Sequence, residues 1–255
     1  MGVSLSWLAP LNTMDNLSYC QEVKAKSKTA VIFLTYRRLE YFRRTAECLI
    51  SQTNKDFDFY ISNNSNDNDR LIKLITKFLG TEEINIYVKD YYNEFKPFSR
   101  FIMAQDLALE GYEKIIFIDD DEIFSPQFIQ DCYDQYEEDS VKTFWGHKIE
   151  KVYKRKVKLE GNELGNYAGP GGLVCSSKVF LGEELFQCPE QYWIVDDLWL
   201  SYYLLKFTDY NIKTLKTKID FIKDAKATFL TLGNLKQEFS NEFILPESKH
   251  LPVLV

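Results

Sequence analysis

The stretch Lys114-Ile115-Ile116-Phe117-Ile118-Asp119-Asp120-Asp121 runs from four consecutive apolar residues directly into three carboxylates. Short continuous apolar runs are typical of strands that are buried on both faces in a parallel sheet. In α/β sheets, ligand sites lie at the carboxyl ends of such strands. Three adjacent acids repel one another unless a cation offsets their charge, and magnesium commonly takes one or two carboxylates together with substrate phosphates. The stretch therefore predicts a phosphate-bearing substrate held through a divalent metal.

A regular alternation of strands and helices precedes this stretch. Apolar runs predict strands, and amphipathic stretches between them predict helices. The predicted strands are 29–35, 57–62, 84–88 and 114–118, and the predicted helices are 38–52, 70–79 and 99–109. This alternation implies right-handed βαβ crossovers and a mostly parallel, Rossmann-like sheet flanked by helices.

The pattern is less regular in the second half of the chain. We expect a helix at 126–136, β-prone stretches within 141–157, a glycine-rich turn at 166–172, a strand or a strand and turn at 173–180, and a helix at 196–207. The remainder is expected to mix short strands and loops. Because no repeat or low-complexity linker interrupts the chain, the sequence predicts an N-terminal extension at 1–28, which packs on the domain or stays mobile, and a single domain at 29–255.

Composition and charge exclude several classes of protein. Hydrophobic residues make up 45% of the 255 residues, which is typical of a globular protein. The net charge of −7, from 31 basic and 38 acidic residues, argues against a nucleic-acid-binding protein. The five cysteines lack metal-site or redox spacing, and no apolar run is long enough for a transmembrane segment, so we expect reduced thiols and a cytoplasmic location. Residues 1–6 fit the short N-myristoylation pattern, which leaves a peripheral membrane location open.

The three aspartates have alternative interpretations. A calcium loop needs a central glycine, which Glu122-Ile123-Phe124 does not supply. A haloacid-type phosphatase would place its nucleophile on the first strand, with Ser or Thr where this chain has Ile123. The aspartates could also cap a helix, but Ser125, followed by Pro126, suits that position and leaves the acids unexplained.

With its preceding strand, the acidic stretch resembles the Asp-X-Asp motif of GT-A glycosyltransferases, particularly those similar to glycosyltransferase family 2. Further segments match the same template in the same order: residues 33–38 as opening strand and donor loop, 52–53 and 61–67 as second strand and nucleoside loop, Gly171-Gly172 as acceptor-side glycines, and Val195-Asp196-Asp197 as the acidic pair that opens a helix. The resemblance spans about residues 31–205. It implies a GT-A (nucleotide-diphospho-sugar transferase) fold with a nucleotide-sugar-binding half at 29–125 and a less regular acceptor-binding half at 126–255.

The resemblance implies a metal site and a donor site. Asp121 would bind Mn²⁺ or Mg²⁺ at the donor diphosphate, Asp119 would contact the ribose or the metal shell, and His250 is a candidate additional ligand, with His147 a weaker one. The metal would offset charge on the leaving nucleoside diphosphate. The donor-binding candidates are Thr35, Tyr36, Arg37, Asn63, Asp67, Arg100, Asp119 and Asp120. Arg100 and Lys96 fit a solvated basic turn equally well, and Asn63 and Asp67 fit a solvated turn.

Asp197 matches the family's general base, and Asp196 matches the acid before it. Two adjacent carboxylates are expected to raise each other's pKa, which suits a base near neutral pH. The same pair would also be favoured simply by the dipole at a helix N-terminus. Nearby, Tyr192 and Trp193 could form a platform for an acceptor ring, whereas Trp199 inside the helix is expected to be core.

The resemblance thus implies metal-dependent transfer of a sugar, with inversion, from a UDP-, GDP- or dTDP-sugar to a hydroxyl of a glycan, a lipid-linked acceptor or a protein. Ser62 and Asn63 stand where many relatives have a base-recognising aspartate, so the donor base stays open. One alternative is a nucleotidyltransferase with the same sheet architecture, although the first strand lacks that class's glycine-rich signature. The other is a catalytically inactive sugar-nucleotide-binding module.

Overall fold

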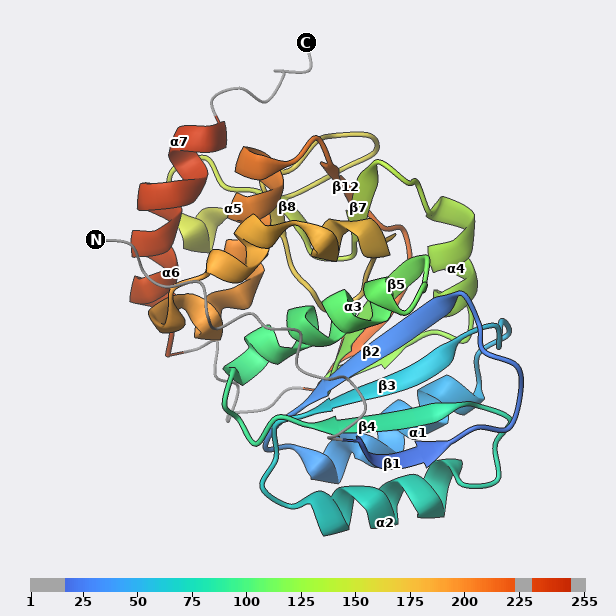
Figure 1. The fold of residues 1–255 in the computed structure, drawn as a ribbon. Helices are drawn as coiled ribbons and strands as arrows, with labels where there is room; N and C mark the ends of the chain where they lie inside the picture. The colour runs from blue at the N-terminus through green and yellow to red at the C-terminus, as the bar shows by residue number, and fades with distance from the viewer. Residues whose placement is uncertain (1–16, 223–230, 249–255) are drawn as a thin grey trace.

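The central element of the fold is a mixed, mostly parallel sheet (Figure 1). The computed structural model describes residues 17–222 and 231–248, and within them the sheet has eight strands in the order β1-β4-β3-β2-β5-β11-β7-β12. These are β1 (Leu17–Gln21), β2 (Thr29–Thr35), β3 (Asp58–Asn63), β4 (Ile86–Asp90), β5 (Lys114–Asp119), β7 (Ser140–Thr143), β11 (Leu173–Ser176) and β12 (Asn211–Thr214). Strands β4, β3, β2 and β5 are mutually parallel, whereas β1 and β11 pair antiparallel with their neighbours. The predicted mostly parallel α/β fold is therefore confirmed.

Helices cover both faces of the sheet. In Figure 1, α1 (Phe42–Ile50) and α2 (Asn68–Leu79) lie on one face and α3 (Ser99–Leu109) on the other. Alternate residues of β2 serve the two faces: Val31 belongs to the core under α1 and α2, and Ile32 to the core under α3. Burial of both sets explains why the first-half strands read as continuous apolar runs.

The first-half elements lie where the sequence predicts them. β2 has the predicted bounds, and β3, β4 and β5 differ from prediction by one or two residues at their ends. The predicted helix at 38–52 consists of a 3₁₀ turn (Leu39–Tyr41) followed by α1. The aspartate stretch follows β5 as a tight turn, after which β6 (Glu122–Phe124) pairs antiparallel with β13 (Ile219–Phe221).

The second half of the chain, predicted to be the acceptor-binding half, contains short elements around one long helix. It comprises α4 (Phe128–Gln135), a three-stranded sheet of β10 (Tyr167–Ala168), β8 (Gly146–Lys148) and β9 (Val157–Lys158), and α5 (Asp196–Phe207). Its 3₁₀ helices are Tyr153–Arg155, Ser177–Leu181, Glu183–Gln187 and Glu190–Val195, and the first half adds Lys96–Phe98. The helices at 126–136 and 196–207 and the strand near 173 are confirmed.

Two segments differ from the expectation. Residues 17–21 form an edge strand of the main sheet, within the stretch expected to be an extension. After α5, the expected mixture of short strands and loops is wrong for the last described residues, which are helical: α6 (Gly233–Phe239), a π-helical turn (Ser240–Ile244) and α7 (Leu245–Glu247). Phe239 and Ile244 are fully buried in the core under α5, so tertiary packing stabilises a helix that local sequence does not reveal.

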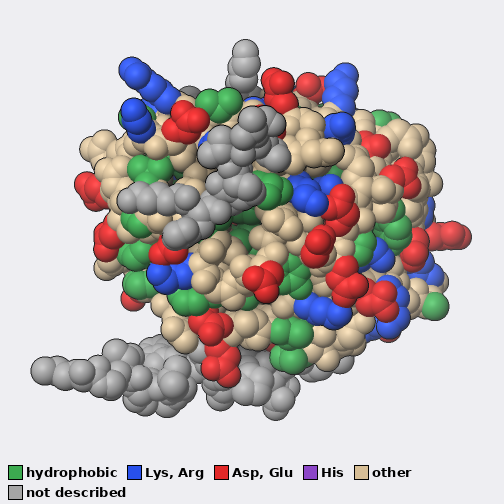
Figure 2. Space-filling model, turned by 90° about the horizontal axis from the view of Figure 1, so that it is seen from above, with side chains coloured by type: hydrophobic (Ala, Val, Ile, Leu, Met, Phe, Trp, Pro, Cys, Tyr) green, Lys and Arg blue, Asp and Glu red, His purple; other side chains and the backbone are tan. Residues whose placement is uncertain are grey.

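The surface and the cysteines agree with the composition. Figure 2 shows a face on which acidic and basic side chains are interspersed. All five cysteines are free thiols, and only Cys20 is exposed. No helix in the described ranges is both long and apolar enough to cross a membrane.

Candidate active site

The aspartates after β5 are held by an arginine from the loop after β2. Arg38 Nη1 donates to Asp121 Oδ2 at 2.8 Å, and Arg38 Nη2 donates to Asp120 Oδ1. Asp120 is buried, while the side chain of Asp121 keeps 21% of its exposure. Arg37, the arginine predicted from the sequence, is instead exposed and lies over the ring of Tyr36. Arg38 is thus a site residue that the sequence analysis missed, although it lies in the quoted donor loop.

Arg100 connects the two halves of the site. From the first turn of α3, its Nη1 donates to Asp119 Oδ1 at 2.8 Å, and its Nε lies 3.1 Å from Asp196 Oδ2. The second contact is ionic, since Asp196 Oδ2 receives no well-aligned hydrogen bond. Arg100 is only 4% exposed, so the interpretation as a solvated basic turn is wrong. One buried guanidinium therefore joins the acid at the end of β5 to the acid at the start of α5.

Glu122 is a further acid in the same cluster. It is buried, its Oε2 accepts from the backbone N–H of Asp119 at 2.9 Å, and its Oε1 has no hydrogen-bond partner. Burial and the Asp119 charge raise the pKa of Glu122 well above its usual range. A Cβ on Gly171 would collide with Glu122 Oε1 and lie 2.8 Å from Asp119 Oδ2, so only glycine fits beside these acids.

The cluster carries more negative than positive charge. Five carboxylates (Asp119, Asp120, Asp121, Glu122 and Asp196) share the two guanidinium groups of Arg38 and Arg100. Burial and neighbouring carboxylates raise the pKa of Asp120 to about 7 and also raise that of Asp121. A divalent cation would relieve this excess.

The residues fit a divalent metal that is completed by substrate. In the described ranges, no three His, Cys, Asp or Glu side chains are arranged to hold a metal ion by themselves. Mg²⁺, however, commonly uses one or two carboxylates plus substrate phosphates, and the oxygen donors here suit such hard ions. The unpartnered Glu122 Oε1 beside Asp119 adds a further oxygen of the kind that such an ion prefers. His250 lies outside the described residues.

The loop after β3, which is predicted to be the nucleoside loop, is built around buried amides. Asn63 at the end of β3 donates to Asp90 Oδ1 at 2.6 Å, and its own Oδ1 accepts from the Ser65 backbone and hydroxyl. Asp90, at the end of β4, also accepts from Asn68, and burial raises its pKa. Asp90 is not among the predicted site residues, because nothing in the local sequence distinguishes it from a surface acid.

Two other donor-loop candidates have structural roles. Asp67 caps α2 by accepting from the Arg70 backbone N–H at 3.2 Å. Thr35 ends β2, is 1% exposed, and its carbonyl accepts from the Asn64 backbone N–H at 2.8 Å. Tyr36 is half-buried beside it and accepts from Asn93 at 3.5 Å. Thr35, Tyr36 and Asn63 therefore border one loop cluster at the carboxyl ends of β2 and β3.

Asp196 and Asp197 lie in different electrostatic surroundings although they are adjacent. Asp197 Oδ2 accepts from Tyr167 Oη at 2.7 Å and from Lys236 Nζ of α6, and its Oδ1 accepts from the Leu198 backbone N–H. Burial opposes ionisation of Asp197, but Lys236 and these hydrogen bonds outweigh it and lower the Asp197 pKa. Burial raises the pKa of Asp196 to about 6 against the opposing charge of Arg100. The expected raised pKa thus holds for Asp196 and is wrong for Asp197.

The candidate aromatic platform packs mainly into the protein. Trp193 donates to the Cys188 carbonyl at 3.1 Å and packs against Phe95, and Tyr192 contacts Phe239. Trp199 is 6% exposed and belongs to the core, as predicted.

His147 is held within the small sheet of the acceptor-side half. It is buried, its Nδ1 lies 2.9 Å from the Trp145 carbonyl, and burial lowers its pKa. It contacts no member of the acid cluster.

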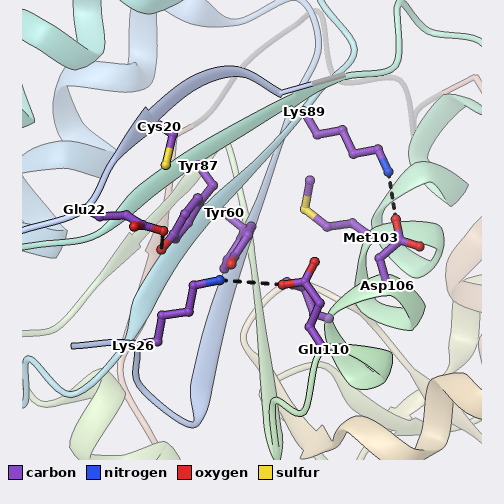
Figure 3. A pocket seen from close by; sticks show the side chains of 10 residues that line it. Cys20, Glu22, Lys26, Tyr60, Tyr87, Lys89, Met103, Asp106 and Glu110 are labelled. Carbon is purple, nitrogen blue, oxygen red and sulfur yellow. Dashed lines mark hydrogen bonds and ion pairs between the residues drawn. The ribbon is translucent and has the colours of Figure 1, made fainter. Parts of the chain in front are cut away.

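A separate cavity of about 70 Å³ lies between the sheet face and α3 (Figure 3). Its walls carry the stacked rings of Tyr60 and Tyr87 and the buried ion pair of Lys89 with Asp106, whose atoms are 2.7 Å apart. None of its lining residues belongs to the acid cluster.

Comparison with known families gives a match over the half of the chain that contains four of the five clustered acids, Asp196 lying beyond it. Residues 30–167 match the family model described as glycosyl transferase family 2. This range includes the donor loop, the nucleoside loop, Arg100 and the three aspartates. A search of curated proteins found none that matches the chain.

Proposed function

The chain belongs to glycosyl transferase family 2, and from that premise we propose that it moves a sugar from a nucleotide-diphosphate donor to a hydroxyl acceptor with inversion. Family membership makes it a glycosyltransferase of class EC 2.4, implies a nucleotide-sugar donor, and sets aside the nucleotidyltransferase alternative. The observation that supports the proposal is the position of the buried Arg100 guanidinium. It contacts both Asp119, on the proposed donor side, and Asp196, on the proposed acceptor side. We further propose residues 29–125 as the donor half and 126–255 as the acceptor half.

In the proposed mechanism, Asp121 and Asp119 would hold Mn²⁺ or Mg²⁺, and Asp120 stays paired with Arg38. The ion would supply Lewis-acid neutralisation of the leaving nucleoside diphosphate. Before the ion binds, Arg38 must break its contact with Asp121 while it keeps its contact with Asp120. Arg38 Nη1, on a side chain that is 19% exposed, would then be available to donate to a diphosphate oxygen, as guanidinium groups do well.

Donor recognition is proposed for the loop cluster after β2 and β3. Thr35, Tyr36 and Arg37 would contact the nucleoside from one side, and the loop that Asn63 and Asp67 organise would contact it from the other. UDP-, GDP- and dTDP-sugars are the candidate donors. Asn63 is held by Asp90, so the loop would be preorganised before the donor arrives.

For the general base, we propose Asp197 from the family resemblance. The Asp197 oxygens accept hydrogen bonds from Tyr167, Lys236 and a backbone N–H. The hydrogen bond from Lys236 must therefore break when an acceptor hydroxyl binds. Asp196 is a second candidate, because its Oδ2 receives no hydrogen bond and its pKa of about 6 suits a base near neutral pH. The candidate acceptors are hydroxyls of glycans, lipid-linked sugars or proteins, and the free thiols favour a cytoplasmic location, with or without peripheral membrane attachment.

The test is release of nucleoside diphosphate from a panel of UDP-, GDP- and dTDP-sugars with Mn²⁺. We expect turnover in the wild-type chain, loss in Asp121→Ala, and normal turnover in Asp134→Ala, which removes an exposed acid on α4. The product's anomeric proton, followed by NMR, should show inverted configuration. A chain that binds donors but never releases nucleoside diphosphate would instead be an inactive binding module.

A further inference from the structure

An unusually basic segment lies in the acceptor half of this acidic chain. Residues 148–158, here called the basic segment, contain Lys148, Lys151, Lys154, Arg155, Lys156 and Lys158, against the single acid Glu150. Among the described residues, none of these six cations forms an ion pair, whereas Arg38 and Arg100 at the acid cluster and Lys236 beside Asp197 each pair with a carboxylate. A concentrated, unpaired charge of this kind attracts anions.

Three aromatic rings lie directly beside this segment. Phe144, Trp145 and Phe221, here called the aromatic floor, contact one another with ring centroids 4.9 to 6.1 Å apart. All three keep part of their exposure, and Phe221 is 36% exposed. Lys158 Nζ lies 4.0 Å from the Phe144 ring centroid, so an ammonium group already stands over the floor. Sugar rings present apolar C–H faces that pack on partly exposed aromatic rings of this kind.

The aromatic floor begins at the donor acids. Phe221 pairs with Glu122 across β13 and β6, and the next residue, Ile222, donates its backbone N–H to the Asp121 carbonyl at 2.9 Å. Gly169 permits this placement, because a Cβ there would lie 2.6 Å from Trp145 Cβ. A sugar on the floor would therefore lie next to the acid turn.

A chain of rings continues from the floor to the candidate base. Trp145 stacks on His147 at 5.9 Å, His147 contacts Tyr167 at 5.7 Å, and Tyr167 donates to Asp197. Lys156, half-buried, stands over the Tyr167 ring at 5.5 Å. Lys158 of the basic segment thus lies at the aromatic floor, and Lys156 lies beside Tyr167, the residue that donates to Asp197.

We propose that the acceptor is an anionic saccharide, whose ring packs on the aromatic floor and whose phosphate or carboxylate group binds Lys156 and Lys158. The inference rests on the proposed function, since it names the substrate class of that same site. A neutral glycan would gain nothing from six unpaired cations, whereas an anionic one would gain attraction during approach and charge-assisted hydrogen bonds once bound.

The test compares three probes by calorimetric titration at low ionic strength: α-D-glucose 1-phosphate, methyl β-D-glucuronide and methyl β-D-glucoside. We expect at least one anionic probe to bind about tenfold more tightly than the neutral glucoside. The Lys156→Gln, Lys158→Gln double variant should lose that advantage. Whichever anion binds more tightly identifies phosphate or carboxylate as the recognised group.

The matched control is Lys73→Gln, Lys77→Gln. It removes the same charge from exposed positions on α2, including a lysine that also lies over a ring, Phe78. This control should keep the preference for the anionic probe. Equal binding of all three probes, or equal losses in the two double variants, would overturn the proposal.

Donor binding separates this proposal from the proposed function. The Lys156→Gln, Lys158→Gln variant should bind Mn²⁺ with nucleoside diphosphate as tightly as the wild-type chain, because the acids proposed for the donor are untouched. If that affinity falls together with anion binding, the basic segment serves the donor and the inference is wrong. If the wild-type chain releases nucleoside diphosphate from no donor, the proposed function fails, whatever the probes show.

Discussion

Two adjacent aspartates show how neighbours decide the chemistry of a carboxylate. Asp197 is held by an ammonium, a phenol and a backbone N–H, so its ionised form is stabilised even in the interior. Asp196 lies beside one buried guanidinium, that of Arg100, and burial raises the pKa of Asp196 to about 6. Such a difference between neighbouring groups is the usual way in which one site separates its acid and base roles.

The Asp196 pKa predicts the acid limb of the pH profile. Asp196 is ionised above about pH 6 and protonated below it, so kcat/KM should fall as the pH drops through about 6, when Arg100 loses one of its carboxylates. Asp196→Asn should remove this limb and lower kcat/KM at all pH values. Asp134→Asn, on the surface of α4, should leave the limb in place. A limb that persists in Asp196→Asn would assign the titration to another group.

Removal of Lys236 should destabilise the protein strongly. Lys236→Met leaves Asp197 buried without its cation, and loss of one partner of a buried pair costs about 3–5 kcal/mol. Because the Asp197 pKa is lowered in the fold, this contribution is fully present above the unfolded pKa of about 3.9 and is lost progressively as the pH falls from there through the lower pKa of the folded state. Urea denaturation at pH 7 and pH 3 measures both effects. Lys206→Met, whose partner Glu247 is on the surface, should cost far less at either pH.

Among the elements, the glycine turn at 169–172 holds the two halves of the site together. Gly169 faces Trp145, Gly171 faces Glu122 and Asp119, and Gly172 has a φ of 63°, which side chains rarely adopt. Each glycine therefore meets a different neighbour at close range. The turn acts as a spacer between the donor acids and the aromatic floor.

Gly171→Ala should disturb the donor acids without unfolding the chain. The added methyl group would displace Glu122 Oε1 and Asp119, and a misplacement of about 1 Å at a catalytic group costs on the order of 100-fold in rate. Donor turnover and the melting temperature should be measured together. The control is Gly233→Ala, where the methyl group meets only the flexible end of Lys154. Unchanged turnover in Gly171→Ala would mean that these acids do not need their present positions.

Elements whose burial produces a local apolar pattern could be predicted from the sequence. The strand runs of β2, β3 and β5 and the acids after β5 are such cases. Arg38, Asp90 and Lys236 were missed because their partners are distant in sequence, and no local pattern records a partner that only tertiary packing supplies. Glu122 accepts from the Asp119 backbone only three residues away, and it was missed because its burial beside Gly171 is set by tertiary packing. The strand β1 was missed for a related reason: an edge strand with one covered face needs few apolar residues.

At the scale of the molecule, the sheet separates two hydrophobic cores. The candidate site lies at the carboxyl ends of the strands, next to both cores. Core residues of α1, α2 and α4 pack on one face, and those of α3, α5 and α6 on the other. Asp119 ends a strand shared by both cores, since Ile116 and Phe117 of β5 face opposite sides. Ligand binding at this site is therefore expected to raise the free energy of unfolding of the whole fold.

A metal with a nucleoside diphosphate should raise the melting temperature of the whole chain. A ligand at about 100 times its Kd that binds only the folded state stabilises by about 2.7 kcal/mol. Mn²⁺ with UDP, GDP or dTDP should produce such a shift in wild-type protein, and Asp121→Asn should abolish it. EDTA should reverse the shift, and Asp134→Asn should retain it. Equal shifts in Asp121→Asn would place the ion elsewhere.

The outermost strand β1 has a consequence for the solubility of shortened chains. β1 pairs with β4 and occupies backbone N–H and C=O groups that would otherwise form an open sheet edge. An open edge next to a buried parallel strand is a template for pairing with another molecule. A chain trimmed to begin at residue 29 would keep every acid of the site and yet expose this edge. We expect it to self-associate on gel filtration more than the full chain does, and this result would mean that the segment carrying β1 protects the fold from aggregation.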